Sequence, residues 1–168
     1  IPMEEHVEKI RAAVAARDDM LIIARTDCRA THDLNEVVRR LEAYRDAGAD
    51  IIYADALRGP EEMKVVGAIP GVYKFANQVE FGKTPPLSAD EIQALGFSIV
   101  IYPVGTIFTA ARAIQNMLAE LKAKRCMTED TAKMTTFAEY NKIVGMDELV
   151  AMESSYKVDE YKSRLKQD

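Results

Sequence analysis

Four short apolar segments, each followed by polar residues or a helix-like stretch, dominate the sequence. They read MLIIA at 20–24, ADIIYADA at 49–56, GVYKFANQVE at 71–80 and FSIVIYP at 97–103. Segments that are apolar along their length are typical of parallel strands buried on both faces. Strands that alternate with helices predict a parallel sheet joined by right-handed helical crossovers. This alternation therefore predicts an α/β fold.

Helical periodicity fills the intervals between these segments. Asp33 and Ser88 are suited to begin helices, because their side chains can accept a backbone N–H of the first turn. Gly48 suits the position just after a helix. The expected helices cover residues 3–16, 34–47, 59–69, 89–96 and 106–124, with further helices from residue 128 onward that break near Gly145.

Polar side chains gather where the predicted strands end. Arg25 and Asp27 follow the first strand, Asp55 ends the second, and Asn77 and Glu80 end the third. The carboxyl ends of parallel strands share one edge, and ligands bind at that edge in open α/β sheets and in (β/α)₈ barrels. These five residues are therefore the candidates for a functional site.

Each candidate has a chemical and a structural interpretation. Arg25 offers a planar fork of donors for a carboxylate or phosphonate, or it forms a structural salt bridge with Asp27 or Asp55. Asp55 can orient a substrate, accept a proton or pair with Arg25. Asn77 can donate to an oxyanion and Glu80 can fix the orientation of a neighbour, or both simply cap the strand end.

Other reactive side chains carry weaker predictions. Lys83 and Thr84 in GKTPP form either an anion-binding loop or an ordinary turn. His6 and His32 lack partners at metal-ligand spacing, so we expect both to be exposed to solvent. Cys28 lies next to the site edge, and an inert thiol is the favoured interpretation.

Composition excludes several classes of function. A formal net charge of −5 over 168 residues gives no footprint for binding nucleic acid. We find no apolar run long enough to span a bilayer and no signal peptide. The two cysteines match no metal or redox spacing, which favours a reduced, cytoplasmic compartment.

Four strands do not close an eight-stranded barrel. The sequence leaves open a doubly wound sheet or half of a barrel whose other half is supplied elsewhere. A phosphate-binding glycine motif would favour the open sheet, and neither GxGxxG nor a Walker sequence is present. The residues alone predict an α/β protein that binds a small anion at its strand ends.

Four ordered motifs carry a family resemblance: ARTD, AYRDAGAD, ANQVEFGKTP and FSIVIYPVGT. Together they resemble the isocitrate lyase/phosphoenolpyruvate mutase superfamily from Pro2 to about Tyr156. The tail MTTFAEYNKIVGMDELVAMESSY is similar to the carboxyphosphonoenolpyruvate mutase-like and petal-death-protein-like branch. The resemblance implies a (β/α)₈ barrel, with strands five to eight in residues 1–125 and a C-terminal helical segment of the same domain in residues 126–168. It also implies a homo-oligomer in which the last barrel helix is swapped between subunits.

The resemblance further implies a Mg²⁺-dependent lyase or mutase. Such enzymes cleave or rearrange a C–C or P–C bond of a small α-oxo or α-hydroxy acid through an enolate. The family's metal-binding acids and mobile catalytic loop lie upstream of the matched motifs, and IPMEEH matches the segment just after that loop. We therefore expect no metal ligand in this chain, and an N-terminal half that is a separate chain or a cleaved fragment and holds the base.

By the same resemblance, Arg25 holds the substrate carboxylate, and Asp55 falls where many members use Glu to contact the substrate. Arg25 and Asp55 are thus the implied catalytic residues. The third-strand end that meets the substrate consists of Asn77, Gln78 and Val79, and the residues that support the site from behind are Asp27, Glu80 and Pro103.

Two departures from the family pattern bear on the substrate. Phe108 stands where methylisocitrate lyases carry an Arg for an additional carboxylate, which argues against a tricarboxylate. Pro103 is typical of lyases of the family. Asp55 is one methylene shorter than Glu, which leaves open a second reading: a non-catalytic structural or regulatory member.

Overall fold

The computed structural model describes residues 1–126 and 131–156. Contacts divide the chain into two compact units, Ile1–Ile114 and Gln115–Asp168, and we describe each by itself. The division falls inside helix α5 (Gly105–Lys124). The boundary after residue 125 that the family resemblance implies stays a prediction.

The first unit contains a four-stranded parallel sheet. Its strands are β1 (Ile23–Thr26), β2 (Ile51–Ala54), β3 (Tyr73–Asn77) and β4 (Ile99–Ile101), in the spatial order β1-β2-β3-β4. All three strand pairs are parallel, which confirms the predicted α/β fold. A doubly wound sheet reverses its strand order at a switch point. The order of the four described strands has no such reversal.

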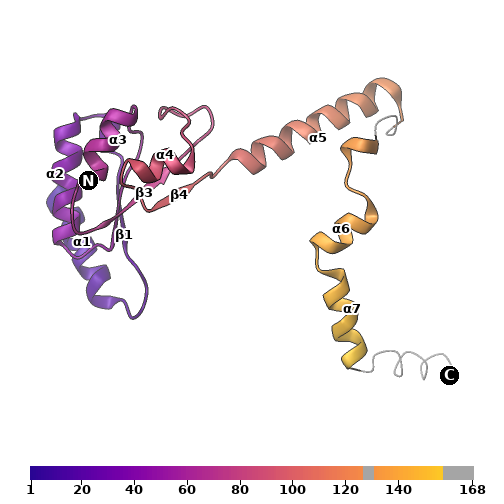
Figure 1. Cartoon of the computed structure of the whole chain (residues 1–168), viewed down its shortest axis with the longest axis horizontal. Helices are drawn as coiled ribbons and strands as arrows, with labels where there is room; N and C mark the ends of the chain where they lie inside the picture. The colour runs from indigo at the N-terminus through magenta and orange to yellow at the C-terminus, as the bar shows by residue number, and fades with distance from the viewer. Residues whose placement is uncertain (127–130, 157–168) are drawn as a thin grey trace. The chain divides into compact units, whose positions relative to one another are not determined.

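Helices connect the strands as predicted (Figure 1). They are α1 (Met3–Ala16), α2 (Leu34–Asp46), α3 (Pro60–Gly67) and α4 (Ala89–Ala94), with a short 3₁₀ turn η1 (Cys28–Ala30) after β1. The Asp33 side chain caps α2 by accepting from Glu36 N, and Ser88 forms a reciprocal capping box with Glu91. Gly48 follows α2 with φ 98°, a conformation that favours glycine. The predicted caps are thus confirmed.

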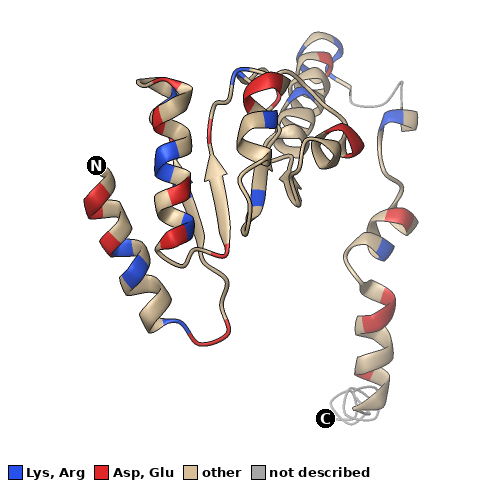
Figure 2. Cartoon of the chain, turned by 60° about the vertical axis from the view of Figure 1, so that its left-hand side comes forward, with Lys and Arg blue, Asp and Glu red and all other residues tan. Residues whose placement is uncertain are grey.

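The helices carry charge on one side and apolar residues on the other. Figure 2 marks the positions of acidic and basic residues along the ribbons of α1 and α2. The partners in ion pairs such as Lys9–Glu5 and Arg39–Glu36 lie about one helical turn apart. The opposite side of α2 buries Val37, Leu41 and Tyr44 completely. Such an amphipathic pattern directs α2 onto the sheet.

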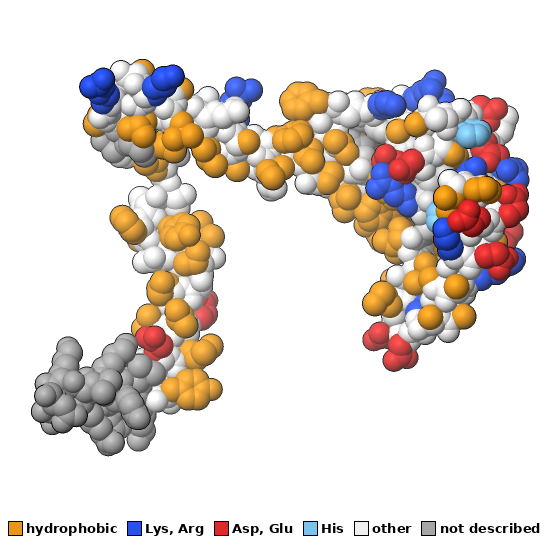
Figure 3. Space-filling model, turned by 180° about the vertical axis from the view of Figure 1, so that it is seen from behind, with side chains coloured by type: hydrophobic (Ala, Val, Ile, Leu, Met, Phe, Trp, Pro, Cys, Tyr) orange, Lys and Arg blue, Asp and Glu red, His pale blue; other side chains and the backbone are white. Residues whose placement is uncertain are grey.

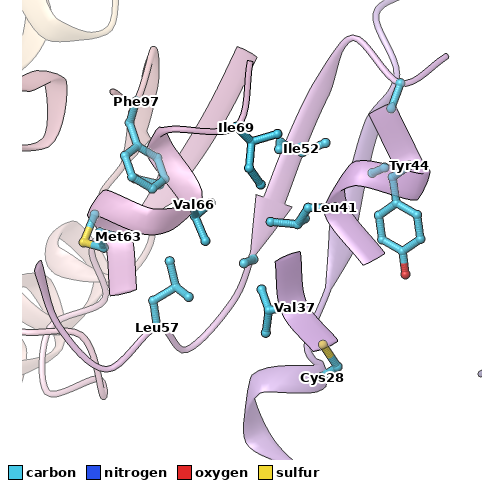
Figure 4. Packing of buried hydrophobic residues seen from close by; sticks show 14 of the residues in the cluster. Cys28, Val37, Leu41, Tyr44, Ile52, Leu57, Met63, Val66, Ile69 and Phe97 are labelled. Carbon is cyan, nitrogen blue, oxygen red and sulfur yellow. The ribbon is translucent and has the colours of Figure 1, made fainter. Parts of the chain in front are cut away.

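The hydrophobic core lies between the helices and one face of the sheet (Figure 4). Side chains alternate between the two faces of a strand, and Ala24, Ile52 and Ala76 point to this face. They pack with side chains from α2 and α3 and from the loops between elements: Val37, Leu41, Tyr44, Leu57, Met63, Val66, Ile69 and Phe97. The core thus holds the strands in register and fixes the edge where their carboxyl ends meet.

The other face of the sheet differs from the prediction. The sequence favoured strands buried on both faces, but only β2 is buried along its length, and β1 alternates between exposed and buried positions. Large apolar side chains of this face are at least partly open to solvent: Ile23, Tyr73, Ile99 and Ile101. The reason is that the described helices of the first unit cover only one side of the sheet.

The second unit is helical, with η2 (Thr131–Lys133), α6 (Phe137–Ile143) and α7 (Met146–Ser155) after the end of α5. Gly145 has φ 68° between α6 and α7, which confirms the predicted break. No residue of α5, α6 or α7 is buried in the described chain. Figure 3 shows many hydrophobic side chains on the surface of these helices. The exposed large apolar residues of α6 and α7 include Phe137, Ile143, Leu149, Val150 and Met152.

Candidate functional site at the carboxyl ends of the strands

Arg25 lies at the centre of the predicted site, between two carboxylates. Its Nε donates to Asp27 Oδ1 at 2.6 Å, and its Nη2 lies 3.1 Å from Asp55 Oδ2. The Asp27 hydrogen bond is the main reason that the pKa of Arg25 is raised. The Arg25 side chain is still 50% exposed. Both salt bridges that the sequence allowed are therefore present, and the cation nevertheless reaches the surface.

The order of β1 and β2 explains why these residues meet. Arg25 pairs with Tyr53 across the two parallel strands, and Asp55 N donates to Thr26 O at 2.9 Å. Asp27 and Asp55 thus follow neighbouring strands at the same level. No described residue accepts a hydrogen bond from Arg25 Nη1, so the N–H donors of that group have no partner among the described residues.

Tyr53 belongs to the site, although the sequence analysis did not select it. Its ring lies 4.9 Å from Arg25 Cζ, and its hydroxyl donates to Asp55 Oδ1 at 2.6 Å. Burial, followed by this hydrogen bond, raises the pKa of Tyr53 to about 12. In the sequence, Tyr53 stands inside the apolar segment IIYA and is indistinguishable from a core residue of the strand. Its spacing of two from Asp55, which puts both on one face, was the signal that could have identified it.

Asn77 and Gln78 lie on opposite sides of the third strand. Asn77 shares the face of Tyr53, and its Oδ1 is buried without a hydrogen-bond partner among the described residues. Gln78 is 6% exposed, and its Oε1 accepts from Leu87 N at 3.1 Å. Because adjacent residues of a strand alternate in direction, the structure does not bring the Gln78 side chain together with Arg25.

The remaining predicted residues lie away from Arg25. The Glu80 carboxylate is positioned against Gly105, at the start of α5, where a Cβ atom would collide with it. Val79 is half-buried, and its carbonyl accepts from Gly82 N at 2.9 Å. Pro103 is exposed between β4 and α5. These three residues therefore shape the loops after β3 and β4.

The lesser candidates divide between confirmed and wrong predictions. Thr84 donates its hydroxyl to Leu57 O at 2.6 Å, so this group fixes the loop. His32 is exposed as expected, but His6 is half-buried, with its Nδ1 2.9 Å from the Tyr44 hydroxyl. Burial, and then the nearby cations, lower the pKa of His6. Cys28 is a buried free thiol in the core.

A second ion pair connects the segments that follow β1 and β2. Arg29 binds both oxygens of Glu62, with its Nη2 at 2.7 Å from Oε1, and donates Nη1 to His32 O at 2.9 Å. Glu62 also accepts from Arg58 N at 2.9 Å, and the Arg29 hydrogen bonds are the main cause that lowers its pKa. The pair links η1, after β1, to the start of α3, after β2. Sequence reasoning missed it because the partners lie 33 positions apart.

The described carboxylates do not by themselves form a site for a metal ion. In the part of the chain that the structure describes, no three His, Cys, Asp or Glu side chains form a group that could hold one. Asp27 and Asp55 are both engaged by the same guanidinium. Both carboxylates are therefore already paired with a cation in this structure.

The fold and site define an α/β protein with a partly exposed arginine, paired with two carboxylates, at the carboxyl end of a parallel sheet. Residues 1–122 match the family model described as phosphoenolpyruvate phosphomutase. The chain belongs to this family, within the isocitrate lyase/phosphoenolpyruvate mutase superfamily. The resemblance stated from the motifs is thus confirmed.

Curated relatives support the same assignment. The chain is 41% identical to 2,3-dimethylmalate lyase of Eubacterium barkeri over 159 residues, which cover 93% of this chain and 55% of the relative. It is 36% identical to the petal death protein of Dianthus caryophyllus over 159 residues, covering 94% of this chain and 50% of the relative. The chain therefore spans about half the length of these relatives.

Solved structures agree with the observed fold. A crystal structure of 2,3-dimethylmalate lyase matches with a TM-score of 0.84 and 34% identity, covering 93% of this chain and 56% of the other. Phosphonopyruvate hydrolase in complex with oxalate and Mg²⁺ matches with a TM-score of 0.78 and 30% identity, covering 93% and 56%. Among the described residues, no helix is both long and apolar enough to cross a membrane.

Proposed function

We propose that this chain supplies strands five to eight of a (β/α)₈ barrel lyase or mutase. The enzyme acts on a small α-oxo or α-hydroxy acid and cleaves or rearranges a C–C or P–C bond through an enolate. The observation that carries the proposal is Arg25, a half-exposed guanidinium that two carboxylates orient at the ligand-binding edge of the sheet. Its remaining donor would bind the substrate carboxylate or phosphonate.

The rest of the barrel would cover the open face of the sheet. Three observations support this part: the strand order without a switch point, the exposed apolar residues of that face, and the match to half of each relative. The other half would be a separate chain, a cleaved fragment or sequence upstream of residue 1. The last barrel helix would be swapped onto a neighbouring subunit, for which the exposed apolar side chains of α5 to α7 are the support.

The chemistry would be shared between the two halves. Mg²⁺ would stabilise negative charge on the reacting acid, and its ligands and the base would come from the other half. Arg25 would hold the substrate carboxylate in register, and the Asn77 amide would donate to a developing oxyanion. Asp55 and Asp27 would orient Arg25, while Val79, Glu80 and Pro103 would form the loops around the substrate. Gln78 would support the end of β3 from the helix side.

The substrate would be smaller than a tricarboxylate. Phe108 lies close to Phe81, with 6.3 Å between ring centroids, and these apolar rings would not bind a further carboxylate. A dicarboxylate such as the one that gives 2,3-dimethylmalate lyase its name would fit this description.

Oxalate binding tests the proposal. The whole protein, expressed from its natural locus with any upstream sequence, should bind oxalate in the presence of Mg²⁺ in a calorimetric titration. Arg25→Ala should weaken that binding at least about 100-fold, close to 3 kcal/mol, because a charge-assisted contact is lost. Arg11→Ala, at an exposed position on α1, is the matched control and should bind like the wild type. If the wild-type protein does not bind oxalate in the presence of Mg²⁺, the proposal is wrong.

A second candidate function is a non-catalytic structural or regulatory subunit. It is favoured by Asp55, which the salt bridge with Arg25 already engages. Oxalate binding without turnover of any small dicarboxylate would support this alternative. Native mass spectrometry of protein from its source would show whether a second chain of similar size accompanies this one.

A further inference from the structure

Tyr53 connects the two charged groups of the candidate site. Its ring lies 4.9 Å from Arg25 Cζ, and its hydroxyl donates to Asp55 Oδ1 at 2.6 Å. The side chain is only 5% exposed and packs against Phe75, with 4.9 Å between ring centroids. Its neighbours therefore hold the hydroxyl at a defined place beside the Asp55 carboxylate.

Asp55 uses its two oxygens for different partners. Oδ1 accepts from Tyr53, while Oδ2 lies 3.1 Å from Arg25 Nη2. Arginine and carboxylate commonly pair through two parallel N–H···O bonds, which occupy both oxygens. The Tyr53 hydrogen bond engages the oxygen that such a paired arrangement would need. Asp55 consequently meets the guanidinium through one oxygen only.

We infer that Tyr53 is a positioning residue that keeps Arg25 available to a ligand carboxylate by preventing Asp55 from pairing with it through both oxygens. The inference rests on the proposed function, because it assumes that Arg25 binds the substrate. Tyr53 acts through Asp55 and need not touch the ligand. Without its hydroxyl, Asp55 turns its second oxygen to the guanidinium and competes with the ligand for the same donors.

The first test removes only the hydroxyl. In the whole protein with Mg²⁺, Tyr53→Phe should weaken oxalate binding about tenfold by calorimetry and leave the melting temperature unchanged or higher. A merely structural role would lower the melting temperature and leave oxalate affinity unchanged, and that result would overturn the inference. Tyr73→Phe removes a hydroxyl on the same face at the other end of the strands, where Tyr73 pairs with Ile51, and should change neither quantity.

A second substitution tests the competition directly. Asp55→Asn in the Tyr53→Phe background removes the competing negative charge, so oxalate affinity should return to within about threefold of the wild type. Failure of the double variant to recover affinity would overturn the inference, because the lost hydroxyl would then act by another route.

A measurement without ligand separates this inference from the proposed function. The side-chain NMR signals of Arg25 should show slower rotation of the guanidinium in Tyr53→Phe, because a two-pronged pair restrains both Nη groups. If the Arg25 guanidinium rotates more slowly in Tyr53→Phe but the protein does not bind oxalate, the inference about Tyr53 and Asp55 is supported and the proposed enzymatic function is wrong. If the guanidinium rotation is unchanged in Tyr53→Phe and the protein binds oxalate, the proposed function is supported and the role inferred for Tyr53 is wrong.

Discussion

Arg25 and its partners form a site in which one cation is shared by two acids. Asp27 and Asp55 are 62% and 30% exposed, so neither is isolated from water. Contacts between exposed charges stabilise a fold weakly, because water screens them. We therefore expect these ion pairs to orient the guanidinium more than they stabilise the sheet.

The Arg29–Glu62 ion pair is mostly buried, with side chains 10% and 18% exposed. We therefore expect it to contribute more to the stability of the fold than the exposed pairs of Arg25 do. Glu62→Gln should lower the free energy of unfolding at pH 7 by about 2 kcal/mol, since hydrogen bonds to charged groups contribute about 1.5–3 kcal/mol. Denaturant unfolding of the full chain would measure the loss. Glu8→Gln on the exposed surface of α1 is the control and should have little effect.

The same pair predicts a dependence on pH. The Arg29 contact lowers the pKa of Glu62 in the folded chain, so its stabilisation is present above the unfolded value near 4.5. It is lost as the pH falls through the lower folded pKa. The difference in stability between wild type and Glu62→Gln should therefore shrink in strong acid. A difference that stays constant from pH 7 into strong acid would contradict this assignment.

At the scale of elements, the packing of α2 on the sheet determines how firmly the site edge is held. Leu41 is fully buried between α2 and the strands. Leu41→Ala should lower the free energy of unfolding by about 2–5 kcal/mol, through lost apolar burial and a residual cavity. Leu21→Ala makes the same chemical change at a position that is 62% exposed. Equal losses for the two variants, in thermal or denaturant unfolding, would contradict the role assigned to α2.

Elements were also the scale at which sequence reasoning was most successful. The strands, the helices and the caps at Asp33 and Ser88 follow from local patterns, because each depends on residues within a few positions. The expected burial of both sheet faces was wrong for β1, β3 and β4, because burial depends on layers that other parts of a protein supply. A local pattern identifies a strand and does not reveal what covers it.

At the scale of the whole molecule, the unpartnered apolar side chains are the main feature. Val150 on α7 is 53% exposed, with several other large apolar side chains on α6 and α7. If the proposed exchange of helices between subunits buries it, Val150→Glu should lower the molar mass of the assembly, measured by light scattering. Ser155→Glu adds the same charge on a different face of α7, at an exposed polar position, and is the control. An unchanged molar mass for Val150→Glu would contradict a role of this position in the exchange.

The sequence by itself determined the α/β class, the order of elements, the helix caps and the edge on which Arg25, Asp27 and Asp55 meet. These features depend on local propensity and on the rule that parallel strands share their carboxyl edge. Only the tertiary structure decided that Tyr53 joins Arg25 to Asp55, that Gln78 turns away toward Leu87, and that Arg29 pairs with Glu62. Such contacts depend on strand register and on side-chain direction, and these are fixed only when segments distant in the chain pack together.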